Sequence, residues 1–294
     1  MVLSIFTAGE PRQGGRDFGP FPPDPSIPMP NIVVFVRPVP QDLNVTVSRR
    51  TGEPILEGAR FIIDRWEKRA IELGLRLRDE HGGTVTVVSM SELDQTVSLR
   101  EALAMGADKA VLLADKAFEG ADTLSTARVL AAAAEKLRAE LVITGGRTAD
   151  RRAAGVGPMV AQLLNIPSVT FITSAELAGR RVRVKKRFGA KIATYEVPLP
   201  CLLSVSEEIP KPRIATAWGV ADAFRLKDVT LWNRRDLDIH EESVGREGSP
   251  TRVRRFEKIR EEKREAAQCE FFEGDADEVA RAFVRRLKAR GGVA

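Results

Sequence analysis

The sequence has only two histidines and two cysteines among its 294 residues, so side chains that commonly bind metals or act as nucleophiles are scarce. His81 and His240 have no cysteine or second histidine at ligand spacing, and Cys201 and Cys269 lie far apart. We interpret both histidines as surface residues and both cysteines as buried thiols. Because no nucleophile–base pair is evident, the sequence supports neither hydrolysis nor acyl transfer, and we expect no catalytic residue and no metal site.

Long hydrophobic runs are missing too. No stretch of about 18 uncharged apolar residues occurs, which is the length needed to span a bilayer, so we do not expect a membrane-spanning chain. Residues 1–30 are rich in glycine and proline and lack the basic-then-apolar pattern of a signal peptide, so we expect an irregular N-terminal extension. Together with the scarce cysteines, this favours a reducing, cytoplasmic location.

The charge balance is basic, with a net charge of +5 and a pI near 9.4. However, 46 lysines and arginines are interleaved with 41 aspartates and glutamates, for example in residues 252–264. Alternating signs on a helix are typical of a solvated surface with many salt bridges. The chain also has a single tyrosine and no RNA-binding signature, so we do not expect it to bind nucleic acid.

Short apolar runs rich in β-branched residues alternate with amphipathic runs from residue 31 onward. The pattern predicts strands at 31–37, 84–90, 109–114, 140–145 and 168–172. Between them it predicts helices at 57–80, 99–105, 121–137 and 157–164. Strand and helix alternating in this way indicate an α/β fold, Rossmann-like and doubly wound, with a mainly parallel sheet.

The alternation of strands and helices ends near residue 180. Residues 181–188 and 193–197 flank Gly189 and predict an antiparallel hairpin, and residues 201–206 predict one more buried strand. We therefore expect a nucleotide-binding α/β domain at 31–210. Residues 211–294, here called the arm, have no continuous apolar pattern before a last helix at about 275–289, and we expect the arm to wrap a partner. The alternative is a disordered tail.

Three segments lie where ligands bind in an open parallel sheet, beyond the carboxyl ends of the strands. Arg37 and Val39 follow the first strand, Met90 ends the second, and Asp122, Thr123 and Thr126 precede or open the Ala-rich helix. The loop after the fourth strand contributes Gly145, Asp150, Arg151, Arg152, Ala154, Gly155, Val156 and Gly157. Its arginines and glycine amides suit a phosphate.

The same residues can also be explained by ordinary structural roles without a ligand. The 145–158 segment has neither a Walker lysine nor a Gly-x-Gly-x-x-Gly motif, and it is also typical of an ordinary strand-to-helix loop with solvated arginines. Asp122 is equally well explained as the N-cap of the following helix. Spacing alone does not decide between these readings.

Several motifs, taken in order, resemble one known family. They are residues 31–40 (Asn-Ile-Val-Val-Phe-Val-Arg-Pro-Val-Pro), 99–108 (Leu-Arg-Glu-Ala-Leu-Ala-Met-Gly-Ala-Asp), 118–126 (Phe-Glu-Gly-Ala-Asp-Thr-Leu-Ser-Thr), 156–158 (Val-Gly-Pro), 198–201 (Pro-Leu-Pro-Cys), 212–216 (Pro-Arg-Ile-Ala-Thr) and 248–251 (Gly-Ser-Pro-Thr). This order resembles the beta subunits of electron-transfer flavoproteins, in particular the branch whose beta subunit can carry a second FAD. The similarity runs from about residue 31 to 290.

The resemblance implies a redox carrier subunit rather than a catalyst on its own. It implies an alpha-subunit partner that holds most of the redox FAD, a flavin dehydrogenase as electron donor, and a quinone oxidoreductase or similar acceptor. It also implies a pocket in the beta subunit for AMP or a second FAD, with the phosphates near Asp122, Thr123 and the 145–158 loop. The redox chemistry would belong to the cofactor.

The sequence departs from that branch in the loop itself. Members usually read Asp-Gly-Asp-Thr-Ala-Gln-Val-Gly-Pro, whereas this chain reads Asp-Arg-Arg-Ala-Ala-Gly-Val-Gly-Pro at 150–158. A carboxylate and a hydroxyl are lost and two cations are gained, and arginines can hold a phosphate. Upstream, the family's Asn-Pro-aromatic-Asp is replaced by Asp-Arg-Trp-Glu at 64–67. The alternatives are a degenerate structural subunit with an empty pocket and a stand-alone nucleotide-binding protein.

Overall fold

The structure is a computed structural model that describes residues 2–7, 30–41, 48, 55, 59–91, 95–147, 154–209, 211–251 and 270–290. The described residues fall into two compact units. The first unit holds those up to residue 251 and the second holds residues 270–290. Each unit is described by itself.

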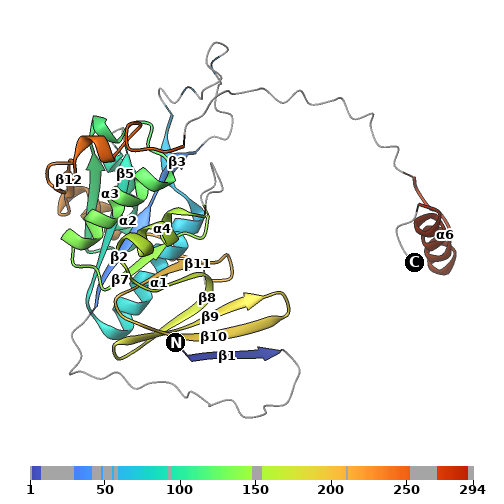
Figure 1. The fold of residues 1–294 in the computed structure, drawn as a ribbon. Helices are drawn as coiled ribbons and strands as arrows, with labels where there is room; N and C mark the ends of the chain where they lie inside the picture. Colours follow the sequence, from blue (N-terminus) through green and yellow to red (C-terminus); the bar gives the residue numbers. More distant parts are fainter. Residues whose placement is uncertain are drawn as a thin grey trace. The chain divides into compact units, whose positions relative to one another are not determined.

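The first unit is built on a ten-stranded sheet with the order β1-β10-β9-β8-β11-β7-β2-β5-β6-β12 (Figure 1). The strands are β1 Val2–Thr7, β2 Asn31–Val36, β5 Thr84–Ser91, β6 Lys109–Ala114, β7 Leu141–Thr144, β8 Ser168–Ala178, β9 Arg181–Phe188, β10 Lys191–Pro198, β11 Cys201–Val205 and β12 Val229–Trp232. From β8 to β12 in this order all neighbours are parallel. The predicted α/β fold with a mainly parallel sheet is therefore confirmed.

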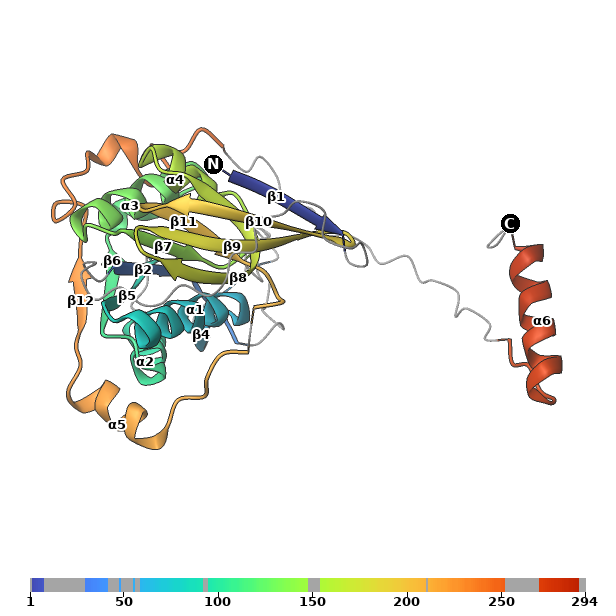
Figure 2. The same cartoon turned by 90° about the horizontal axis from the view of Figure 1, so that it is seen from below.

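Helices cover both faces of this sheet (Figure 2). One face carries α1 Arg65–His81, α2 Thr96–Met105 and α5 Ala217–Arg225, and the other carries α3 Thr123–Lys136 and α4 Val156–Leu163. Side chains alternate between the faces along each strand, so Ile32 and Val34 of β2 join the α1 core while Val33 and Phe35 join the α3 core. The sheet is thus buried on both sides, as its near-continuous apolar runs require.

The helix predicted at 57–80 begins later than the apolar spacing indicated. Phe61–Ile63 forms strand β4, which pairs with β3 (Pro38–Pro40) in a small antiparallel sheet. Helix α1 starts only after Asp64, whose carboxylate accepts a hydrogen bond from the backbone N–H of Trp66 and caps the helix. The prediction was wrong at this end because a short strand and a helix share the same apolar residues.

Residues 1–30 were expected to be irregular, yet Val2–Thr7 forms β1. It pairs antiparallel with β10, with Val2 opposite Glu196 and Thr7 opposite Lys191. The run Val-Leu-Ser-Ile-Phe-Thr has the β-branched and apolar content of a strand, and β10 offers a sheet edge with unpaired backbone groups. The predicted hairpin is confirmed as β9 and β10, with β8 antiparallel to β9 beside it.

The first part of the arm packs on the α/β domain. Strand β12 extends the sheet beside β6, and Val244 and Leu237 are buried in the α3 core.

In the second unit, Asp275 caps α6 (Ala276–Ala289) by accepting from the N–H groups of Asp277 and Glu278. Phe272 meets Phe283 of α6 edge to face, with the ring centroids 6.1 Å apart. The predicted last helix is confirmed within one residue.

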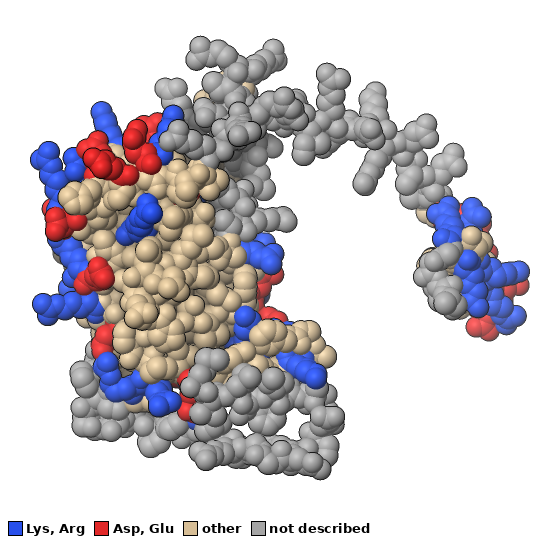
Figure 3. Space-filling model, viewed as in Figure 1, with Lys and Arg blue, Asp and Glu red and all other residues tan. Residues whose placement is uncertain are grey.

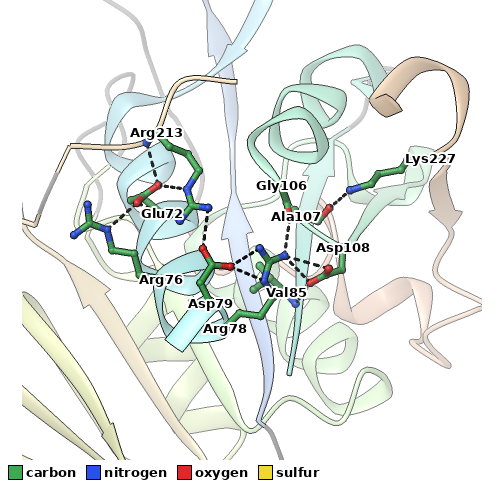
Figure 4. A network of polar contacts seen from close by, with 10 residues as sticks. All are labelled: Glu72, Arg76, Arg78, Asp79, Val85, Gly106, Ala107, Asp108, Arg213 and Lys227. Atoms are coloured by element: carbon green, nitrogen blue, oxygen red, sulfur yellow. Dashed lines mark hydrogen bonds and ion pairs between the residues drawn. The ribbon is translucent and has the colours of Figure 1, made fainter. Parts of the chain in front are cut away.

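An ion-pair network ties the start of the arm to α1 (Figure 4). Arg213 donates from its backbone N–H and its Nε to Glu72 Oε2 at 3.0 and 2.9 Å, and its Nη1 lies 2.9 Å from Asp79. Arg76 donates to Glu72 Oε1 at 2.7 Å. Burial raises the pKa of the Glu72 carboxyl, but these donors outweigh it and the net pKa lies below the ordinary value.

The neighbouring contacts of this network fix the turn before β6. Arg78 donates to Gly106 O at 2.7 Å and to both oxygens of Asp108 at 3.1 Å, and Asp108 accepts from the N–H of Val85 at 2.8 Å. Gly106 has φ +117, a conformation that favours glycine, and ends α2 there. The network therefore joins α1, the α2–β6 turn and the arm into one rigid corner.

Candidate functional site

The starts of α3 and α4 lie side by side beyond the carboxyl ends of β6 and β7. A Cβ placed on Gly155, just before α4, would lie 4.0 Å from Thr123 Cγ2 and 3.8 Å from Met159 Cε. The first backbone N–H groups of a helix have no partner within the helix, and the helix dipole favours anions there. The structure thus brings together Thr123 and Gly155, two residues that the sequence placed at a phosphate cradle. We call residues 122–125 and 154–157 the cradle.

Asp122 acts as the N-cap of α3, which is the structural role that the sequence left open for it. Its Oδ1 accepts from the N–H groups of Leu124 and Ser125, both at 2.9 Å, and its Oδ2 accepts from the N–H of Thr251 at 3.0 Å. Burial raises the pKa of this carboxyl, but the hydrogen bonds from the backbone N–H groups of Ser125 and Thr251 lower it by a larger amount. The net pKa therefore lies below the ordinary value of an aspartate. The Asp122 side chain therefore remains charged at neutral pH.

The start of α4 packs tightly on the sheet. A Cβ on Gly157 would meet Thr144 Oγ1 at 3.0 Å and Leu202 Cδ2 at 3.3 Å. Gly146 is tighter still, because a Cβ there would lie 2.3 Å from Val205 O. Gly157 therefore holds the start of α4 against β7 and β11, and Gly146 holds the chain after β7 against the end of β11; the first contact fixes where the N–H groups of α4 point.

A second group of predicted residues gathers around Glu67 at the start of α1. The backbone N–H of Arg37 donates to Glu67 Oε2, and a Cβ on Gly145 would lie 3.0 Å from Glu67 Cγ. Arg37 itself is exposed, whereas Glu67 is buried. Because β2 and β7 are neighbours, their ends meet here. This group lies toward the α1 face of the sheet edge, and the cradle toward the α3 face.

The other predicted residues have packing positions or lie beyond the description. Val39 is buried in β3, and Met90 and Val156 pack against the α3 core. Thr126 is half-buried in the first turn of α3 and Ala154 is exposed before α4. Asp150, Arg151 and Arg152 lie outside the described residues, so their predicted contact with a phosphate stays a prediction.

The cradle has features that fit a nucleotide phosphate. Within the described residues, the hydroxyl of Ser125 is buried and has no hydrogen-bond partner. A buried hydroxyl in this state costs free energy unless a further group completes it. Gly155 leaves open the space that a side chain would fill beside Thr123. A phosphate beside the start of α4 would meet the first N–H groups of that helix, whereas those of Leu124 and Ser125 in α3 already donate to Asp122.

Two surfaces of the first unit are short of charge. In Figure 3 the face formed by α3 and α4 is largely uncharged, with lysine, arginine, aspartate and glutamate around its border. Helix α4 contains no charged residue, and Met159 and Leu163 are exposed on it. The second surface is α5 and its flanks, where Ile214 is 92% exposed, Trp218 82% and Leu226 78%.

Helix α5 is held firmly although its apolar residues are exposed. Arg100 of α2 donates to Lys227 O at 2.8 Å and to Ala223 O, and its guanidinium lies 5.3 Å from the centroid of the Phe224 ring. Gly219 touches α2, because a Cβ there would lie 2.5 Å from Ala104 O. The exposed tryptophan is therefore displayed on an anchored helix.

None of the described helices is long and apolar enough to cross a bilayer. In the described part of the chain, no three histidine, cysteine, aspartate or glutamate side chains gather as a metal site would need. Burial raises the pKa of the Cys201 thiol to about 12, as expected for a structural thiol in β11.

Comparison with known proteins identifies the family. The model of the electron transfer flavoprotein domain matches residues 55–232, which include strands β5 to β12, helices α1 to α5 and the cradle. The chain belongs to the beta-subunit family of electron transfer flavoproteins. The electron transfer flavoprotein subunit beta of Thermoanaerobacterium thermosaccharolyticum is 37% identical over 260 residues, which cover 88% of this chain and 98% of that protein.

Two further relatives carry more specific names. The caffeyl-CoA reductase-Etf complex subunit CarD of Acetobacterium woodii is 37% identical over 76% of this chain and 85% of its own length. Protein FixA of Azorhizobium caulinodans is 36% identical over 76% of this chain and 83% of its own length. The resemblance read from the motifs is thus confirmed, and this beta-subunit family protein functions in electron transfer.

Sequence reasoning missed two parts of the site in this flavoprotein subunit. It noted Glu67 only as a departure from a family motif, although its carboxylate organises the ends of β2 and β7. It noted residues 248–251 as a motif without a role, although Ser249 and Thr251 contact Asp122. No local spacing signals a contact across 129 positions of the chain.

Proposed function

We propose that this chain is the beta subunit of a heterodimeric electron carrier, which passes electrons from a flavin dehydrogenase to a quinone oxidoreductase or similar acceptor. An alpha subunit would hold most of the redox FAD, and a cytoplasmic location is part of the proposal. The observation that carries it is the cradle, where Thr123 and Gly155 meet at two helix starts within a domain of this family.

The cradle's own residues would bind AMP or a second FAD. The first N–H groups of α4, which no side chain caps, would hold the phosphates, and Arg151 and Arg152 would add positive charge from the connecting loop. Arg37 and Met90 lie at the ends of β2 and β5, and Val39 lies within the short strand β3 that follows β2; a nucleoside would sit beside them. When bound, FAD supplies the electron transfer itself, and this chain contributes binding and orientation.

The subunit partner would dock on the face of α3 and α4. This face is largely free of charge (Figure 3), and a broad uncharged surface is typical of a permanent interface. The smaller apolar surface of α5 suits a partner that comes and goes, because a transient contact is small and returns to water between encounters. We propose that the donor dehydrogenase binds there through Trp218.

Purification of the chain together with its alpha subunit tests the carrier function. The expected complex is yellow, is bleached anaerobically by a flavin dehydrogenase with its substrate, and recovers its colour when an acceptor is added. A chain that purifies alone, without flavin, and binds ATP would instead support a stand-alone nucleotide-binding protein. A stable complex whose beta pocket is empty would support the degenerate structural subunit.

Replacing Gly155 by glutamate is expected to weaken nucleotide binding by at least about tenfold. The new side chain would enter the space beside Thr123 and place a negative charge where phosphates would bind. The φ of Gly155 is −88°, so a glutamate fits the backbone there and the melting temperature should stay the same. The measurement is calorimetric titration of the nucleotide-free heterodimer with AMP and with FAD.

Leu231→Glu is the matched control for this change. It adds the same charge at an exposed position of the edge strand β12, outside the cradle and outside the α3–α4 face. Equal affinity of Gly155→Glu and the wild type would contradict the placement of the phosphates between α3 and α4.

A further inference from the structure

Hydrogen bonds of four residues fasten the arm to α3. Asp122 Oδ2 accepts from the N–H of Thr251 at 3.0 Å, and the N–H of Asp122 donates to Ser249 Oγ at 2.8 Å. One turn into α3, Arg128 Nη1 donates to Ser243 O at 3.0 Å and to Gly248 O at 2.9 Å. We call Asp122, Arg128, Ser249 and Thr251 the clasp.

The backbone around the clasp is also closely fitted. Gly245 has φ +58, and a Cβ there would lie 1.9 Å from Ala117 O. Val244 is buried in the same core as Phe118, and Ser249 is 5% exposed. The loop at 243–251 is therefore packed firmly against residues 115–128. The last described residue before the second unit, Thr251, lies at the cradle.

The position of the clasp suits it to influence partner binding as well as packing. It lies at the start of α3, the helix that forms the uncharged face with α4 (Figure 3). Thr251 is the last described residue before the rest of the arm. A long segment that docks with a partner loses less conformational entropy when its first residue is already fixed at the interface. An intact clasp therefore lowers the cost of bringing the arm to the partner.

We infer that Asp122 is a positioning residue for the alpha subunit: its carboxylate fixes the exit of the arm beside the α3–α4 face and so strengthens the heterodimer. The inference rests on the proposed function for the identity of the partner. Asp122 does this with the oxygen that is not needed for capping, since Oδ1 serves the N–H groups of Leu124 and Ser125. The same carboxylate therefore orders the cradle and the arm.

Two substitutions each remove the hydrogen bond between Thr251 and Asp122, one by changing the acceptor and the other by deleting the donor. Asp122→Asn keeps a good N-cap residue, but its amide can offer an acceptor to α3 or to Thr251 and not to both. Thr251→Pro deletes the N–H donor in the arm and leaves α3 untouched. Asp236→Asn is the control, because Asp236 accepts from the N–H of Asn233 in an exposed turn far from the clasp.

The expected result is a heterodimer dissociation constant about tenfold higher for Asp122→Asn and for Thr251→Pro, and unchanged for Asp236→Asn. The double variant should be no weaker than either single one, because all three lack the same bond. For Thr251→Pro, which changes no residue of the cradle, the melting temperature and the AMP affinity should stay close to the wild type. In the chain without its partner, amide exchange should rise in residues 243–251 but not in the first turn of α3.

Several results would overturn the inference. Heterodimer affinity equal to the wild type in both variants, or additive losses in the double variant, would contradict it. Should Asp122→Asn also lower the melting temperature, Thr251→Pro decides the question because it leaves the helix cap intact. Failure of the wild type to bind any alpha subunit contradicts the proposed function instead, and the exchange of residues 243–251 then still shows whether Asp122 holds the arm.

Discussion

Trp218→Asp is expected to lower kcat/KM for electron transfer from the donor dehydrogenase by about 30-fold, equivalent to about 2 kcal/mol. Trp218 is the most exposed aromatic residue of α5, and a large exposed aromatic on an anchored helix is typical of an interface hot spot. Aspartate removes the apolar contact and adds a charge that the interface would have to desolvate. The measurement is stopped-flow reduction of the heterodimer at several dehydrogenase concentrations.

Leu231→Asp provides the comparison for this prediction. Leu231 is also exposed in the first unit, but it lies on the edge strand β12 and not on α5. It should leave the rate unchanged. A Trp218→Asp chain that no longer binds the alpha subunit would show instead that α5 belongs to the permanent interface. An unchanged rate would show that α5 belongs neither to the interface with the alpha subunit nor to that with the dehydrogenase.

Glu72→Gln is expected to lower the free energy of unfolding by about 2–3 kcal/mol at pH 7. The Glu72 side chain is 4% exposed and is the common acceptor for Arg213 and Arg76, so its neutralisation leaves two cations with a weaker partner (Figure 4). Both arginines are partly solvated, which places the loss at the low end for a buried pair. The measurement is urea unfolding followed by circular dichroism.

The stability difference between the wild type and Glu72→Gln is expected to depend on pH. The folded pKa of Glu72 lies below 4.5, so the charged carboxylate stabilises the fold fully above about pH 5.5 and loses its effect as the pH falls through the folded value. The difference between wild type and Glu72→Gln should therefore be constant from pH 7 to pH 5.5 and shrink below pH 4.5. Asp79, whose pKa is also lowered by Arg78 and Arg213 against the effect of burial, adds to the acid sensitivity of both chains.

The exposed pair of Glu208 and Arg187 is the control for Glu72. Its atoms lie 2.9 Å apart, but both side chains are close to half exposed. Surface pairs contribute about 0–1 kcal/mol, so Glu208→Gln should change the unfolding free energy little. A loss as large as that of Glu72→Gln would contradict the role given to burial.

Periodicity and turn residues predicted most of the first unit. Apolar runs such as that of β2 have few alternatives to a buried parallel strand, and Gly82 and Gly106 end α1 and α2 where helices need positive φ. The meeting of Thr123 and Gly155 also followed from sequence, because carboxyl ends of parallel strands share one edge of a sheet. Local rules of this kind apply over a few residues or one crossover.

The parts that the sequence did not predict depend on contacts between distant positions. The pair of Arg213 and Glu72 spans 141 positions and that of Thr251 and Asp122 spans 129. Polar partners at such separations have no periodicity, so Asp122 could be named as a cap or a ligand but not as the anchor of the arm. Helix α5 was missed for a related reason, since its apolar side chains face outward and only Ala223 is fully buried.

The count of flavin and nucleotide per purified heterodimer tests the central claim, that the cradle between α3 and α4 binds a nucleotide beside a second polypeptide's flavin. Denaturation, chromatography and mass spectrometry of the released molecules give the numbers. The account predicts one FAD plus one AMP, or two FAD, in the wild type, and loss of the second molecule alone in Gly155→Glu. One FAD and nothing else in the wild type, or the same two molecules in Gly155→Glu, would contradict it.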